Sequence, residues 1–105
     1  MKMVQAIVRP EKEPAVASAL AKAGFPALTK WDVLGRGNQQ GIQVGSQVYD
    51  EVDKSAILIV VNDDRVEAVL EVIRDAALTG YPGDGKIFVT PVESVFTVRT
   101  GKPGL

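Results

Sequence analysis

Two residue types that carry much of protein chemistry are missing from this 105-residue sequence, which contains no cysteine and no histidine. Without cysteine the chain can form neither disulfides nor thiolate nucleophiles. Without histidine it lacks the commonest metal ligand and the usual general base near neutral pH. These two absences exclude most zinc sites and most familiar catalytic sets.

Long apolar runs are also missing. No stretch approaches the roughly twenty apolar residues that a membrane-spanning helix needs. The first ten residues lack the apolar centre of a secretory signal. We therefore expect a cytoplasmic protein with no membrane insertion.

The charged residues do not gather into a surface of one sign. Twelve Lys and Arg are balanced by thirteen Asp and Glu, and they are scattered from Lys2 to Lys102. A nucleic-acid partner needs a basic stripe, so none is expected. The hydrophobic content of 46% and the charged content of 24% are those of an ordinary globule. We expect residues 1–105 to form a single domain.

The spacing of apolar residues predicts the secondary structure. Alternation and short apolar runs predict strands at residues 3–8, 28–34, 56–61, 86–90 and 95–99. Helical spacing predicts one helix from Pro14 to the stop at Gly24, and a second that is capped by Asp63 or Asp64 and ends at Gly80. Residues 37–53 show no sustained period, so an exposed loop is expected there.

This order of elements predicts an α+β fold, the ferredoxin-like β-α-β-β-α-β sandwich. In that fold both helices cover the same face of the sheet. In the run Ala56 to Val61 both the odd and the even positions are apolar, which indicates burial on both faces of its strand. The second face has nothing in one chain to cover it, so we expect the chain to oligomerise.

The segment Thr79 to Phe88 is the most informative motif. Its glycines allow backbone N–H groups to point into one concavity, and Lys86 adds a point charge, which together suit a phosphate. The formal match to the P-loop spacing G-x-x-x-x-G-K is spurious, because Ile87 replaces Ser or Thr and a helix precedes the turn. The alternative interpretation is a helix stop followed by a tight turn.

Two weaker segments could also meet a ligand. Gly35 to Gly41 is rich in glycine and amides, and Arg36 within it could reach an anion, although such a segment is also typical of a flexible turn. Arg99 follows the last apolar alternation, where an arginine is usually solvated.

Taken together, these segments resemble the PII signal-transduction family in order and spacing, over essentially the whole chain. The matching motifs are A-I-V-R-P at 6–10, G-x-G-x-Q-x-G at 35–41, D-D at 63–64, T-G-x-x-G-D-G-K-I-F at 79–88 and R-T-G at 99–101. The resemblance implies a homotrimer with a nucleotide in each cleft between subunits, and it implies a sensor rather than an enzyme.

The resemblance also implies roles for individual residues. ATP or ADP would contact Ile7, Thr29, Gly35, Arg36, Gly37, Asn38, Gln39, Gly83, Asp84, Gly85, Lys86 and, from the adjacent subunit, Arg99. The effector 2-oxoglutarate would contact Gln39, Gln40, Gly41, Lys54 and Gly83, with Lys54 on a carboxylate. Mg²⁺ would be bound by Gln39 beside the phosphates, because a hard cation accepts an amide oxygen.

Some residues depart from the common PII pattern. Asn38 and Thr97 stand where that pattern has basic residues, and Tyr49 lacks the usual surroundings of a uridylylated tyrosine. Together with G-F-P-A-L-T-K at 24–30, these departures resemble the nitrogenase-associated NifI branch, specifically its first subunit. That branch implies a mixed assembly with a second PII-like subunit and dinitrogenase as the target.

Three other interpretations remain. A general PII protein would regulate an ammonium transporter or another nitrogen enzyme, and neighbouring genes would distinguish it. An acylphosphatase on the same fold could use Arg36 and Asn38, but no acid-base pair accompanies them. An RNA-binding module of this element order would display aromatic residues on its central strands, and Ala56 to Val61 has none.

Overall fold

The computed structural model describes residues 1–37, 42–44, 47–49 and 51–105. Its main elements are β1 (Lys2–Val8), α1 (Glu13–Lys22), β2 (Thr29–Gly35), β5 (Val52–Val61), α2 (Val66–Ala77) and β6 (Gly85–Pro91). Short 3-10 turns, Pro10–Lys12 and Asp63–Arg65, lead into the two helices.

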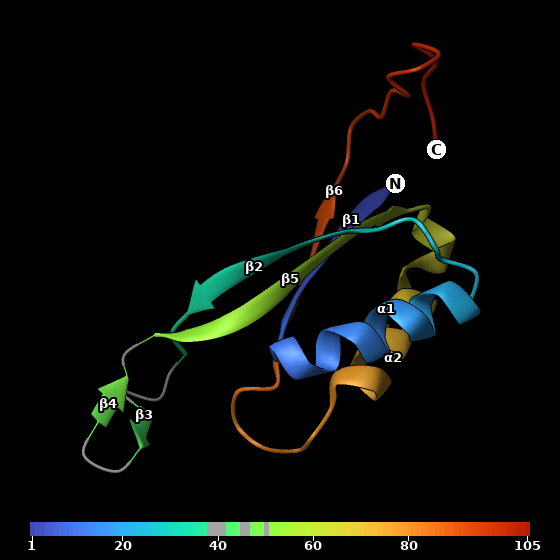
Figure 1. The fold of residues 1–105 in the computed structure, drawn as a ribbon. Coiled ribbons are helices and arrows are strands. Elements are labelled where there is room, and N and C mark those ends of the chain that lie inside the picture. Colours follow the sequence, from blue (N-terminus) through green and yellow to red (C-terminus); the bar gives the residue numbers. More distant parts are fainter. Residues whose placement is uncertain (38–41, 45–46, 50) are drawn as a thin grey trace.

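The four main strands form one antiparallel sheet in the order β2-β5-β1-β6. Both helices lie against the same face of this sheet (Figure 1). The α+β ferredoxin-like prediction is therefore confirmed.

The hydrophobic core lies between the sheet and the helices. Alternate residues of the two central strands point into it, among them Val4 and Ala6 of β1 and Ile57 of β5, all fully buried. From the helices, Leu20 and Ile73 are buried against them. This alternation follows from the two-residue period of a strand.

The opposite face of the sheet is also apolar, and neither described helix covers it (Figure 1). The strand register sets Ile7, Ala56 and Trp31 in one row across this open face. Trp31 is 40% exposed and Phe88 is 53% exposed. The two-sided apolarity predicted for Ala56 to Val61 is thus present, with one side left uncovered in the single chain.

The segment predicted as a loop at 37–53 is more regular than expected. It contains β3 (Ile42–Val44) and β4 (Gln47–Tyr49), which pair antiparallel as a two-stranded sheet, and β5 already begins at Val52. The prediction of an irregular loop is wrong for these strand residues. Strands of three residues are too short to establish a period in the sequence.

The strand predicted at 95–99 is wrong as well. That segment forms a turn in which Gly101 N–H donates to Thr97 O at 2.7 Å, and an isolated bridge pairs Phe96 with Pro103. It lies beyond the end of β6 and projects away from the sheet and helices (Figure 1). Phe96 is 63% exposed and Val98 fully exposed.

The predicted cap of the second helix is also corrected. No side-chain cap bond forms at the 3-10 turn that precedes α2, and Asp63 instead accepts a hydrogen bond from the N-terminal ammonium of Met1 at 2.9 Å. The helix ends at Ala77, three residues before the predicted stop at Gly80. In the described part of the chain, no helix has the length and apolar character needed to cross a membrane.

A close backbone contact fixes the start of β6. Gly85 pairs with Val8 and has a φ of 113°, and a Cβ built on it would lie 1.8 Å from the carbonyl oxygen of Ile7. Only a residue without a side chain fits there. Gly80 shares the positive φ, at 91°, but an added Cβ would meet nothing within 4 Å.

Gly85→Ala should therefore destabilise the protein more than Gly80→Ala. Both changes carry backbone strain of about 1–2 kcal/mol, whereas only Gly85→Ala pushes β6 away from β1. We expect an additional loss of about 2 kcal/mol or more at Gly85. Denaturant unfolding at one fixed protein concentration measures the difference. Equal losses in the two variants would contradict the close contact.

Candidate functional site

The segment from Thr79 to Lys86 comprises the loop between α2 and β6 and the first two residues of β6, and it is called the loop below. Its brace is the carboxylate of Asp84. This carboxylate accepts hydrogen bonds from Thr79 N–H at 2.9 Å and from Gly80 N–H at 2.8 Å. The Thr79 hydroxyl donates to it as well and accepts from Tyr81 N–H at 3.2 Å. One carboxylate thus closes the loop on itself.

Two cations from other strands hold the same loop. The Arg9 guanidinium, just beyond β1, donates from Nε to Asp84 at 3.2 Å and from Nη2 to the carbonyl oxygen of Pro82 at 2.8 Å. Lys54 Nζ, on β5, donates to the carbonyl oxygen of Gly83 at 2.7 Å. The loop is thereby fixed to both central strands of the sheet.

The ionisation of these groups reflects their contacts. Hydrogen bonds from Thr79, then from Gly80 and Arg9, hold the pKa of Asp84 well below its usual range. Partial burial and then the nearby charge of Arg9 lower the pKa of Lys54. Asp84 is therefore held as a carboxylate that braces the loop.

Most of the predicted site residues in the described ranges gather at this end of the sheet. Ile7 and Lys86 are register partners on the open face. A Cβ built on Gly35 would lie 3.1 Å from Lys54 Cγ, so the end of β2 packs closely on Lys54. Gly83, Asp84 and Gly85 belong to the loop itself, and exposed Arg36 and Gly37 follow Gly35 directly.

Two predicted residues lie away from this cluster. Thr29 is at the other end of β2 from Gly35, opposite Leu58. Arg99 lies beyond Pro91, and thus beyond the end of β6 remote from the loop (Figure 1). Asn38, Gln39, Gln40 and Gly41 lie outside the described residues.

The sequence reasoning missed Arg9 as a functional residue and did not anticipate that Thr79 and Asp84 bond to each other. Arg9 lies 75 residues before Asp84, so no local spacing could connect them. Only the pairing of β1 with β6 brings the two together.

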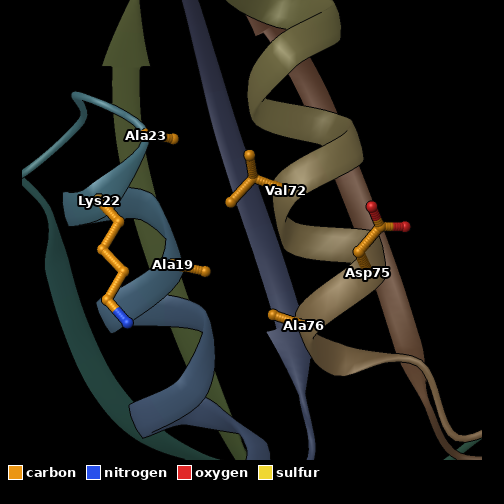
Figure 2. A pocket seen from close by; sticks show the side chains of 6 residues that line it. All are labelled: Ala19, Lys22, Ala23, Val72, Asp75 and Ala76. Atoms are coloured by element: carbon orange, nitrogen blue, oxygen red, sulfur yellow. The ribbon is translucent and has the colours of Figure 1, made fainter.

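Hollows elsewhere on the surface do not coincide with this cluster. A groove of about 550 Å³ lies between α1 and α2, lined by Ala19, Lys22, Ala23, Val72, Asp75 and Ala76 (Figure 2). A smaller hollow of about 280 Å³ lies beside Glu13 and Lys30, which form an ion pair at 2.7 Å. Neither is lined by a residue predicted to bind a ligand.

Comparison with known proteins gives consistent matches. The profile of the family described as "Nitrogen regulatory protein P-II" matches residues 1–102. "Nitrogen fixation nifHD region GlnB-like protein 1" of Methanothermobacter marburgensis is 56% identical over 105 residues, and the protein of that name from Methanococcus maripaludis is 52% identical over 105 residues. Each alignment covers 100% of both chains.

Among solved structures, the chain is similar to one described as "Crystal Structure of Arabidopsis thaliana PII bound to citrate". The TM-score is 0.82 and the sequence identity 43%. The match covers 98% of this chain and 84% of the plant chain.

The brace predicts how stability should depend on pH. Because the folded-state pKa of Asp84 is depressed, its stabilising contribution is full above the unfolded pKa of about 4 and is lost as pH falls below that value. Asp84→Asn should lower the melting temperature at pH 7, and the gap to the wild type should narrow at pH 3. Thermal unfolding at both values tests this, with exposed Asp75→Asn as the control. A gap that stays constant with pH would contradict the ionised brace.

Proposed function

The chain belongs to the nitrogen regulatory protein P-II family and to its NifI branch, and from this membership we propose that it is a nitrogen sensor. It binds ATP or ADP together with 2-oxoglutarate and controls a target protein by direct contact, as a regulator and not as an enzyme. The observation that carries the proposal is the braced loop from Thr79 to Lys86, with two cations fixed on its carbonyls.

The loop supplies the phosphate site. Gly83 and Gly85 have φ values of 101° and 113°, which give the backbone turns that side chains would oppose. At Gly85 the space for a Cβ is already taken by the Ile7 carbonyl. Backbone N–H groups of the loop and the ammonium of Lys86 bind the phosphates, as anions are commonly bound.

The rest of the nucleotide meets residues from two subunits. Ile7, Gly35, Arg36 and Gly37 lie near the loop in one chain. Thr29 and the backbone near Gly35 and Gly37 contact the adenosine, and Asn38 is a further nucleotide contact. Arg99 comes from the adjacent subunit, since within its own chain it lies beyond the far end of β6. The supporting observation is the uncovered apolar sheet face, which a trimer buries at its centre.

The effector 2-oxoglutarate binds beside the phosphates. Lys54 carries one of its carboxylates, and Gln39, Gln40, Gly41 and Gly83 complete the subsite. The plant relative whose structure is described as bound to citrate supports a carboxylate ligand on this fold. Lys54 fits this role because an ammonium has three donors and, among the described residues, one of them is engaged, by Gly83.

Mg²⁺ would be bound at the same site by an amide oxygen of the protein and by oxygens of the bound nucleotide and 2-oxoglutarate. Within the described ranges no three acidic side chains gather to hold a metal ion, and the Asp84 carboxylate is engaged by the loop. The amide oxygen of Gln39 would hold the ion, which neutralises phosphate charge when bound.

The target is dinitrogenase, and the chain works in a homotrimer or in a mixed assembly with a second PII-like subunit. The supporting observation is that relatives sharing 56% and 52% identity are named for the nitrogen-fixation nifHD region. The second candidate is a general PII protein acting on an ammonium transporter or another nitrogen enzyme, which would share the fold.

Lys86→Ala tests the phosphate site. Removing a charged hydrogen bond should weaken ATP and ADP binding by about 1.5–3 kcal/mol, roughly ten- to a hundredfold. Isothermal titration calorimetry measures the change, with Lys22→Ala on α1 as a matched control. Wild-type affinity for both nucleotides in Lys86→Ala would reject the phosphate assignment.

Gln39→Ala tests the sensor mechanism. In the wild type, 2-oxoglutarate should bind only with MgATP and should release the target. The reason is that Gln39, at the base of the segment 37–53, binds the Mg²⁺ ion that ATP and 2-oxoglutarate share. The variant should fold yet keep its target at 2-oxoglutarate concentrations that dissociate the wild type, through loss of a coupling of about 1–3 kcal/mol per site. Pull-down of dinitrogenase across a 2-oxoglutarate series reads this out. Unaltered release in Gln39→Ala would overturn the mechanism.

A further inference from the structure

The carbonyl groups of the loop are the starting point for an inference that rests on the proposed function. Two consecutive carbonyl oxygens, those of Pro82 and Gly83, each accept a hydrogen bond from a cation outside the loop. Arg9 reaches the first from the end of β1, and Lys54 reaches the second from β5. Carbonyl groups in an exposed loop can simply bond to water. Here two consecutive carbonyls are bonded to side chains from two different parts of the sheet, which constrains the backbone between them.

The geometry of the peptide group turns this constraint into an orientation of donors. A trans peptide is planar, and its C=O and N–H point in opposite directions. The described residues contain no cis peptide bond. Holding Pro82 O toward Arg9 therefore turns the N–H of Gly83 away from Arg9, and holding Gly83 O toward Lys54 turns the N–H of Asp84 away from Lys54.

Within the described part of the chain, these two N–H groups are left for a ligand. Among the hydrogen bonds of the described residues, neither Gly83 N–H nor Asp84 N–H donates to another protein group, whereas Thr79, Gly80 and Tyr81 N–H all do. Both available donors lie within the segment proposed to cradle phosphates. They are adjacent in the chain and fixed by side chains that do not themselves belong to the loop.

We infer that Arg9 and Lys54 are positioning residues of the phosphate loop, which hold the Pro82 and Gly83 carbonyls so that the Gly83 and Asp84 N–H groups are set for nucleotide phosphates. Donors that are oriented before the ligand arrives bind it without a further ordering cost. Lys54 then links two subsites, because its ammonium has three N–H donors and can donate to a carboxylate while it also donates to Gly83 O.

Arg9 acts through the shape of its guanidinium as well as its charge. It bridges Pro82 O and the Asp84 carboxylate with two different nitrogens. A lysine at this position would keep the charge but would not present two donors in a fixed planar fork. Arg9→Lys therefore separates positioning from simple attraction of an anion.

The test compares a ligand that has phosphates with one that has none. ADP binding to the full-length protein is measured by calorimetry without 2-oxoglutarate, and adenosine binding by NMR titration. Lys54→Met and Arg9→Lys should each weaken ADP binding about three- to tenfold, the range for losing one intramolecular hydrogen bond. Adenosine affinity should be unchanged. Lys30→Met is the matched control, because Lys30 pairs with Glu13 and not with the loop.

The outcomes are distinguishable. Unchanged ADP affinity in both variants would overturn the inference while leaving the proposed function intact. An equal loss for ADP and adenosine would also overturn it, since that result means a general structural defect. Wild-type ADP affinity in Arg9→Lys alone would assign Arg9 an electrostatic role and reject its positioning role. A wild-type protein that binds neither ATP nor ADP would remove the proposed function and the inference together.

Discussion

The backbone contact between Ile7 and Gly85 is the constraint on which the site depends. It is the point where the end of β1 meets the start of β6, with a carbonyl oxygen in the space that a Cβ would fill. Because β1 ends there, Arg9 emerges directly beside the loop that precedes Gly85. Because β5 is the other neighbour of β1, Lys54 arrives from the opposite side. A single central strand thus determines which residues can reach the loop.

The elements that could be predicted from the sequence are those that bury one face against the core. In α2 the buried residues Val69, Ile73 and Ala77 recur at helical spacing, so the helix was evident. Residues 95–99 alternate equally well but are not a strand, because an alternating segment also needs a partner. The N–H of Val92 bonds to Met1 O, and beyond it the pairing found among the described residues is the isolated bridge between Phe96 and Pro103.

In the candidate site, too, some features could be predicted from the sequence and others could not. Its glycine-rich loop could be predicted because positive φ values and close backbone approach leave a local mark in the composition. The bracing role of Asp84 could not be predicted, because a carboxylate in a glycine-rich loop can either contact a ligand or close the loop. The contacts of Arg9 depend on strand pairing across 73 and 75 residues, which no local pattern reports.

The charges around the loop bear on how the proposed site would recognise phosphate. Arg9 is already paired with Asp84, so its positive charge is locally balanced. Asn38 and Thr97 carry no charge. The proposed site therefore relies less on net charge and more on neutral backbone donors held in place. Affinity that depends on preorganised donors responds to small changes in loop geometry, and Lys54, which bonds the Gly83 carbonyl, lies where the proposed effector subsite would meet the loop.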